Sequence, residues 1–222
     1  MKRTLLALTL ALGFLATAAP PAHASWVGDN CYNYTYAESE LKRSEARAYA
    51  EIARNEGYEY GGGCWNTNDR DDTPGQPDSL GEGPDCSGFT FKTWELRSTE
   101  GAHGFRWWSR IENMHGPYGS WDFWDPVSGW PFYNISKART ATVWMDAFAR
   151  NGHVGILYTN TGPSDGTDYI IEAACDACGT GVFTETFRYD SRYTGVRREN
   201  WTAECSPQCG SAPDALPPVV KL

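Results

Sequence analysis

The sequence has little positive charge. Only 19 of its 222 residues are Lys or Arg, against 28 Asp and Glu, and the net charge is −9. No stretch of the chain gathers basic residues into a stripe, which is the feature that holds nucleic acid or an anionic membrane. We therefore expect neither kind of partner. A neutral or zwitterionic partner, or one recognised by local contacts, fits this composition better.

Long apolar runs are also scarce. The stretch from Leu5 to Ala19 is short for a membrane span, and no second one follows. Lys2 and Arg3 precede it, and Ala22-His23-Ala24 follows it with the small-residue pattern of a cleavage site. The sequence therefore predicts a secretory signal peptide over residues 1–24 and a secreted product without a membrane span.

The remainder of the chain shows no internal repeat and no second-domain boundary, so residues 25–205 are predicted to form one domain. Residues 206–222, rich in Pro and Ala, are expected to be a loosely ordered tail. A helix is predicted over residues 38–55, ended by Gly57, and a second over residues 86–97. Three strands are predicted at residues 153–158, 169–174 and 181–184.

This order of elements indicates an α+β fold, with N-terminal helices packed on a small antiparallel sheet. Residues 100–135 match neither a helix nor a strand and hold five of the ten tryptophans, so aromatic-rich loop insertions are expected there. These tryptophans either fill the core or wall a cleft and stack on sugar rings.

The chain has an odd number of cysteines. Seven are present, and export permits disulfides. If Cys86 stays free, three bridges can form among Cys31, Cys64, Cys175, Cys178, Cys205 and Cys209. The C-x-x-C and C-x-x-x-C pairs within this set can alternatively bind zinc through four thiolates. Disulfides are expected because the compartment of a secreted protein is oxidising.

Cys86 stands where a segment of helix breakers gives way to an apolar, helix-like segment, in the run Gly83-Pro84-Asp85-Cys86-Ser87-Gly88. The first turn of a helix has unpaired N–H groups and a partial positive charge, which favour a thiolate. A lone cysteine is most often a small buried apolar residue. At a helix start, however, the thiolate is a candidate nucleophile.

A thiolate nucleophile needs a base, and His153 opens a predicted strand, which is a rigid platform. The other two histidines of the mature chain lie in glycine-containing loops. If the hairpin closes symmetrically near Gly162-Pro163, His153 faces Glu172, close enough for contact. A carboxylate there would fix the imidazole tautomer and stabilise its charged form. The predicted catalytic residues are therefore Cys86, His153 and Glu172.

The same residues carry a resemblance. In order, the chain contains Gly57-Tyr58-Glu59-Tyr60-Gly61-Gly62, Asp85-Cys86-Ser87-Gly88, Gly152-His153-Val154-Gly155-Ile156 and Ile170-Ile171-Glu172-Ala173. This series resembles the NlpC-type cell-wall peptidases, papain-like cysteine peptidases that act on bacterial peptidoglycan stem peptides. The resemblance covers most of residues 38–183. It implies a papain-like fold, no cofactor or metal, and cleavage of peptide bonds in stem peptides by a secreted monomer.

The resemblance also implies roles for single residues. Cys86 corresponds to the nucleophile, His153 to the base and Glu172 to the third polar residue. Tyr58 matches the tyrosine near the oxyanion site. The pocket for the amino end of the substrate would be lined by the two neighbours of the nucleophile, Asp85 and Ser87.

Three features depart from the family pattern. The third catalytic position is usually histidine, about twenty residues are inserted before Asp85, and the tryptophan-rich segment is longer than the family needs. Other classes stay open: a non-catalytic module that binds wall glycan through the aromatic segment, or an amidase or acyl transferase on the same scaffold. Paired carboxylates for glycoside cleavage are also compatible with so many acidic residues.

Overall fold

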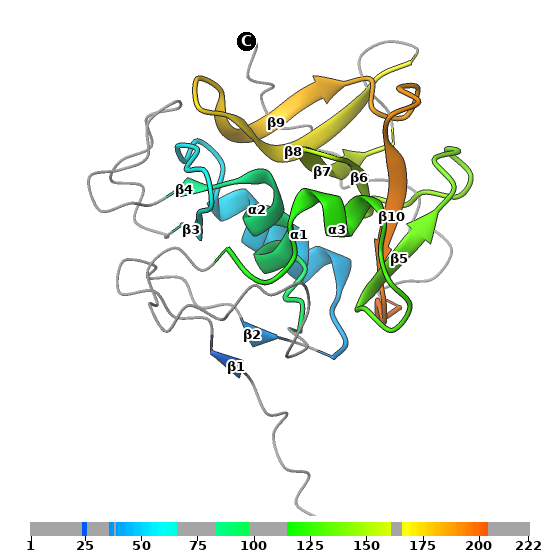
Figure 1. Ribbon diagram of the computed structural model, residues 1–222, viewed down its shortest axis with the longest axis horizontal. Helices are drawn as coiled ribbons and strands as arrows, with labels where there is room; N and C mark the ends of the chain where they lie inside the picture. The colour runs from blue at the N-terminus through cyan, green and yellow to red at the C-terminus, as the bar shows by residue number, and fades with distance from the viewer. Residues whose placement is uncertain are drawn as a thin grey trace, which may run out of the picture.

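The computed structural model describes residues 39–65, 83–97, 115–160 and 166–203, and two short strands at residues 24–25 and 36–37. The predicted tail and nearly all of the predicted signal peptide lie outside these residues. The elements, drawn in Figure 1, are β1 (Ala24–Ser25), β2 (Tyr36–Ala37), α1 (Arg43–Ile52), β3 (Gly63–Cys64), β4 (Gly83–Pro84), α2 (Cys86–Thr93), α3 (Ser120–Trp124), β5 (Phe132–Ile135), β6 (Ala147–Arg150), β7 (His153–Thr159), β8 (Asp168–Cys175), β9 (Gly179–Glu185) and β10 (Thr194–Arg198).

The central feature is a six-stranded antiparallel sheet in the order β5-β10-β6-β7-β8-β9. Helix α2 lies against β7 and β8, α3 lies against β6, and α1 packs on α2 (Figure 1). The fold is therefore α+β, as the sequence predicts. Among the described residues, no helix is long and apolar enough to cross a membrane.

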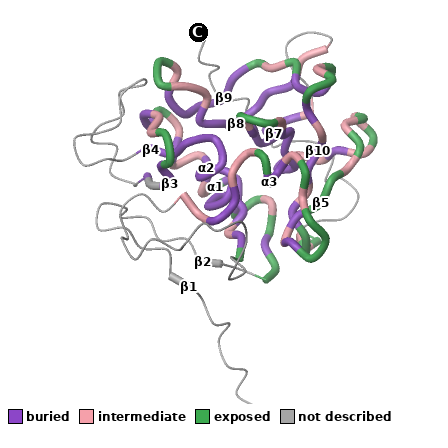
Figure 2. Tube along the Cα trace, viewed as in Figure 1, coloured by how far each residue is buried: buried purple, intermediate pink, exposed green. Residues whose placement is uncertain are grey.

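The core has two parts, one on each face of the sheet. Alternate side chains of the central strands, such as Val154, Ile156 and Ile171, are fully buried and join the core formed with the helices. The opposite face carries a smaller cluster of Phe148, Leu157, Ile170, Phe187 and Tyr193. In Figure 2 helix α2 and the central strands are largely buried, and the exposed residues lie mostly in turns and on the outer side of α1.

The first helix is confirmed, but it is shorter than the predicted residues 38–55. Ala46 and Ala50 are fully buried, and their small side chains allow close packing against α2. The prediction that Gly57 ends this helix is wrong. Asn55 already adopts a left-handed backbone with a φ of 77°, which asparagine tolerates better than most residues.

The second helix begins at Cys86, as predicted, and ends at Thr93 rather than near Arg97. Glu95 adopts a positive φ of 46°, which an α-helix cannot continue through. Every residue of α2 is buried. The helix therefore runs through the core, and its first turn carries the cysteine.

The three predicted strands are confirmed as β7, β8 and β9. Two of the other three strands of the sheet have weak sequence signals: β6 reads Ala-Phe-Ala-Arg, and β10 reads Thr-Gly-Val-Arg-Arg. β10 pairs with both β5 and β6. Hydrogen bonds between these segments therefore stabilise strands that their own residues favour only weakly. The described part of the tryptophan-rich segment contributes α3 and β5.

The β7–β8 hairpin pairs in a different register from the predicted one. Ile156 lies opposite Ile171, and a bulge in β7 near the turn shifts the pairing. Continued to the start of β7, this register places His153 opposite Ala174. The prediction that His153 directly faces Glu172 is therefore wrong. Because the offset is two residues, Glu172 stays on the same face and becomes a diagonal neighbour.

A disulfide joins Cys175 and Cys178 across the turn between β8 and β9. Its sulfurs are not thiolates, so they are not ligands for the four-cysteine zinc site. Cys86 is a free, buried cysteine. The described side chains do not include those of Cys31, Cys64, Cys205 and Cys209.

Candidate active site

The first turn of α2 fixes the position of Cys86. Asp85 is the N-cap residue, and its carboxylate accepts the backbone N–H of Gly88 at 2.7 Å. The backbone N–H of Asp85 donates to the carbonyl of Gly62 at 2.8 Å, which ties the helix start to the glycine-rich bend. A Cβ at Gly88 would lie 2.1 Å from the same carbonyl. Glycine at this position therefore lets the helix start approach the bend.

His153 and Glu172 are in contact. The imidazole Nε2 lies 2.5 Å from Oε2 of Glu172, and their side chains are 12% and 2% exposed. Burial by itself lowers the pKa of His153, but its interactions with the Cys86 and Glu172 side chains raise it to about 10. Since Glu172 occupies Nε2, Nδ1 is the nitrogen left for the thiol. The three predicted catalytic residues therefore come together, with the imidazole as the middle member.

Aromatic rings hold the imidazole in place on the smaller core face. The ring of His153 meets Phe187 edge-on at 5.6 Å and Tyr193 at 6.5 Å, and these two rings stack on each other at 4.2 Å. The Nε of Arg150 donates to the Tyr193 hydroxyl at 3.0 Å. No sequence motif marks Phe187 or Tyr193, because both lie in the irregular segment between β9 and β10.

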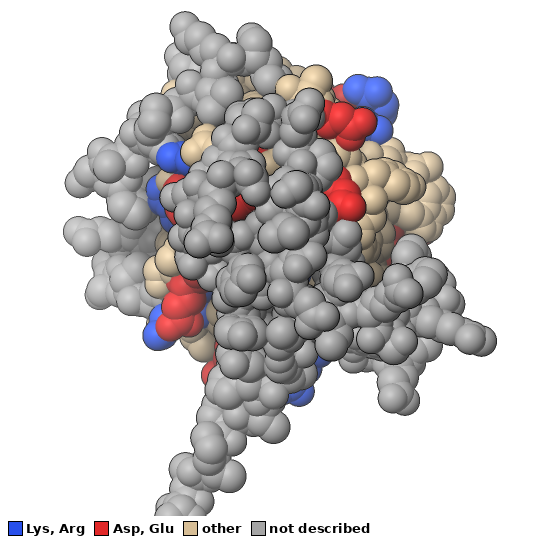
Figure 3. All heavy atoms as spheres, turned by 90° about the vertical axis from the view of Figure 1, so that its left-hand side faces the viewer, with Lys and Arg blue, Asp and Glu red and all other residues tan. Residues whose placement is uncertain are grey.

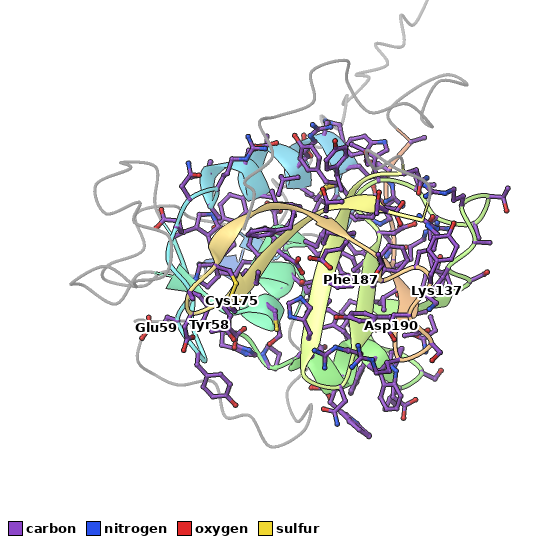
Figure 4. All side chains as sticks on the ribbon, turned by 90° about the horizontal axis from the view of Figure 1, so that it is seen from above. Tyr58, Glu59, Lys137, Cys175, Phe187 and Asp190 are labelled. Carbon is purple, nitrogen blue, oxygen red and sulfur yellow. A yellow bond between two sulfur atoms is a disulfide. The ribbon has the colours of Figure 1, made fainter. Side chains whose placement is uncertain are left out.

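A lysine anchors the segment that carries Phe187. The Nζ of Lys137 donates to the backbone carbonyl of Asp190 at 2.5 Å and to that of Phe187 at 3.4 Å (Figure 4). These bonds fix the segment after β9 to the loop after β5. The segment that carries Phe187 is therefore held by a residue 50 positions earlier in the chain.

Tyr58 lies on the glycine-rich bend, near the turn of the β8–β9 hairpin (Figure 4). It is half-buried, and burial, then the negative charges of Cys86, Asp85 and Asp176, raises the pKa of its hydroxyl well above the usual range. That Tyr58 lies near the oxyanion site therefore stays a prediction.

Asp85 and Ser87 form a buried cluster with His115. The Nε2 of His115 lies 3.1 Å from Oδ1 of Asp85 and 2.7 Å from Oγ of Ser87. Burial raises the pKa of Asp85, but the hydrogen bond and charge of His115, with the backbone donors Gly88 and Gly61, hold it below its usual range. Sequence reasoning misses His115, because it lies in a glycine-containing loop and no motif marks it. The one available signal is the scarcity of histidine, since the sequence contains only four.

The tryptophans divide between core and surface. Trp130, in the tryptophan-rich segment, is buried, which supports the core-filling interpretation for this residue. Trp65 and Trp94, outside that segment, are fully buried, and Trp107 and Trp108 lie outside the described residues. Trp121 is 50% exposed at the start of α3. The preceding residue, Ser120, accepts the backbone N–H of Gly152 at 3.1 Å, next to His153. The start of α3, which carries the exposed Trp121, is therefore hydrogen-bonded to the turn just before His153.

The described surface carries charges of both signs. Figure 3 shows Lys and Arg beside Asp and Glu on the face that it presents. Among the described residues, no three His, Cys, Asp or Glu side chains are grouped so as to hold a metal ion.

Comparison with known proteins gives no match to a family model, to a curated protein or to a solved structure. A proposed function therefore rests on the geometry and chemistry of the site and on the sequence motifs.

Proposed function

We propose that this protein is a secreted, NlpC-type cysteine peptidase that cleaves peptide bonds in peptidoglycan stem peptides. The observation that supports this most is the imidazole of His153 between Cys86 and the buried carboxylate of Glu172. A papain-like arrangement, with the thiol on a helix start and the base on a sheet, agrees with the α+β fold. The substrate class rests on the resemblance in sequence.

The arrangement supports acyl transfer through a thioester. The Cys86 thiolate attacks the carbonyl carbon of the scissile amide, and the imidazolium of His153 gives its proton to the leaving amine. Water then attacks the thioester, His153 takes its proton, and the carboxylic acid and the thiolate are released. Glu172 holds the ring and stabilises its charged form during both steps.

Digestion of purified peptidoglycan, with mass spectrometry of the released fragments, tests this proposal. The wild type should release peptide fragments with new carboxyl and amino ends. Cys86→Ala and Cys86→Ser should release none, although circular dichroism and thermal unfolding show an intact fold. Undiminished release by Cys86→Ala would refute the assignment.

The exposed Trp121 favours a second candidate, a module that holds wall glycan without cleaving it. The same digestion separates the two, because such a module would sediment with peptidoglycan and release nothing. An amidase or acyl transferase would be recognised by products cut at the glycan–peptide link or joined to an added amine.

A further inference from the structure

The carboxylate of Asp85, beside the candidate nucleophile, is already saturated with donors. Its Oδ1 accepts the N–H of Gly88 at 2.7 Å and the hydroxyl of Ser87 at 3.0 Å, and it faces His115 at 3.1 Å. Its Oδ2 accepts the backbone N–H of Gly61 at 3.0 Å. The side chains of Asp85 and His115 are 7% and 14% exposed, so this is a buried arrangement.

The contacts of His115 define its protonation. Its Nδ1 lies 2.9 Å from the backbone carbonyl of Gly116, and its Nε2 faces the Asp85 carboxylate. The Ser87 hydroxyl oxygen also lies 2.7 Å from Nε2, and because its proton is donated to Asp85, this oxygen faces the ring as an acceptor. With acceptors at both ring nitrogens, both carry a proton and the ring is an imidazolium. Burial lowers the pKa of His115, but the bond and charge of Asp85 outweigh this and raise it.

The other charged and titratable groups that act on this pair come from two further elements. Asp122 on α3 adds a negative charge near His115, and it also accepts the N–H of Gly119 at 2.8 Å. Tyr58 on the glycine-rich bend feels the charge of Asp85 and stays neutral. The cluster formed by Asp85 and His115 therefore carries no net charge of its own.

We propose that His115 is a specificity-determining residue that neutralises Asp85, so that the subsite beside Cys86 takes an uncharged amide group rather than a free ammonium. This rests on the proposed function. A bare carboxylate next to the nucleophile would attract an ammonium, but here an imidazolium already holds that place. The preferred substrate is then a stem peptide whose amino end is acylated, as in a peptide still joined to its glycan.

The first test probes the charge of the subsite without any peptidase activity. Cys86 is labelled with a neutral reagent, methyl methanethiosulfonate, and with a cationic one, its trimethylammonioethyl analogue. In both reactions the thiolate attacks the sulfenyl sulfur, a mixed disulfide forms and methanesulfinate leaves. The quantity measured is the ratio of the cationic to the neutral second-order rate constant, which cancels differences in thiolate content.

His115→Gln keeps a polar side chain but removes the charge. The rate ratio should rise about ten-fold, because one unit charge several ångströms from the thiol is lost. His115→Lys should restore the wild-type ratio, and Lys42→Gln, which removes the same charge from an exposed side chain, should leave it unchanged. An equal ratio in the wild type and His115→Gln would overturn the proposal.

The second test uses the wild type, so it does not depend on the folding of a variant. One stem peptide is offered with a free amino end and with the same end acetylated, and kcat/KM is compared. The acetylated peptide should be the better substrate, and faster cleavage of the free amine would overturn the proposal. If neither peptide is cleaved, the proposed function fails, while the labelling ratio still decides the role of His115. Failure of both reagents to label Cys86 in the native protein would overturn both proposals.

Discussion

Gly155 leaves the space that the carboxylate of Glu172 occupies. A Cβ at residue 155 would lie 2.7 Å from Oε2 of Glu172, 2.6 Å from a methyl carbon of Ile170 and 3.1 Å from the ring of Phe187. Gly155 shares a strand face with His153, two residues away, so the missing side chain opens the path between His153 and Glu172. This glycine belongs to the Gly152–Ile156 motif of the resemblance. In the structure, its missing side chain makes room for the Glu172 carboxylate.

Gly155→Ala should therefore weaken both the fold and the site. Overpacking of a tight site typically costs about 1–3 kcal/mol, and here the displaced group includes the carboxylate that orients His153. The free energy of unfolding from urea titration and kcat on peptidoglycan should both fall. Gly119→Ala is the matched control, since the nearest atom to its Cβ is 3.8 Å away. Unchanged stability and kcat in Gly155→Ala would contradict this account.

Glu172→Gln keeps the size of the side chain and removes its charge. Because the lost interaction acts on the imidazolium during the chemistry, kcat should fall substantially more than KM changes. The alkaline limb of the kcat–pH profile should also move to lower pH, since Glu172 helps raise the pKa of His153 to about 10. The acid limb should report the coupled Cys86–His153 pair. A kcat equal to the wild type would remove Glu172 from the mechanism.

The same pair makes stability depend on pH. The folded-state pKa of His153 lies above its ordinary value, so its stabilisation is complete below about pH 6.5 and is lost as pH rises through about 10. The difference in unfolding free energy between wild type and Glu172→Gln should therefore shrink as pH rises through this window. Denaturant titrations at neutral pH and at pH values near the upper end measure it, and a pH-independent difference would contradict the charge interaction.

Glu185 gives a second test of the local electrostatics. Burial and the negative charge of Glu172 raise the pKa of Glu185 to about 7, although His153 and a backbone hydrogen bond act against this. Because the pKa of Glu185 is raised in the folded state, its protonated form favours folding. This contribution to the free energy of unfolding is complete at low pH and is lost as pH rises through about 7. Glu185→Gln should match the wild type near pH 4.5 and be more stable above pH 7, by urea unfolding. An equal effect of Glu185→Gln at all pH values would contradict the account.

Thiol content tests the cysteine assignment. The denatured but unreduced mature protein should have one titratable thiol, and alkylation with peptide mapping should locate it at Cys86. The Cys175–Cys178 bridge should appear as a single peptide that lacks the mass of two hydrogens until it is reduced. Three or more free thiols, or stoichiometric zinc, would contradict the prediction of a secreted protein with three disulfides.

The sequence was sufficient to bring together Cys86, His153 and Glu172, even though the predicted hairpin register was wrong. Side chains alternate across a strand with a period of two, so an even register error keeps each residue on its face. If the predicted register had been wrong by one residue, His153 and Glu172 would lie on opposite faces of the sheet. The predicted contact between them therefore depended on a register error of an even number of residues, as well as on the motif.

Other parts were not accessible from local patterns. The rings of Phe187 and Tyr193 reach His153 through the packing of the smaller core face, and His115 reaches Asp85 across a long segment of chain. Strands β5, β6 and β10 are short, and β6 and β10 are rich in alanine, glycine and arginine, so pairing rather than propensity makes them strands. Such contacts are set by tertiary structure, which a single sequence does not display.

The Cys175–Cys178 bridge spans only three positions in the chain. A bridge that closes so short a loop restricts the unfolded chain little, on the order of 2 kcal/mol in the chain-entropy treatment. Its effect is confined to the tip of the β8–β9 hairpin, where Asp176 contributes to the electrostatics of Tyr58. A reducing buffer therefore has two opposite effects on this protein. It protects the Cys86 thiol from oxidation, but it also reduces the Cys175–Cys178 disulfide and so opens the hairpin tip beside Tyr58. Hydrogen exchange at residues 175–178, with and without reductant, would detect that local opening, and unchanged exchange would exclude it.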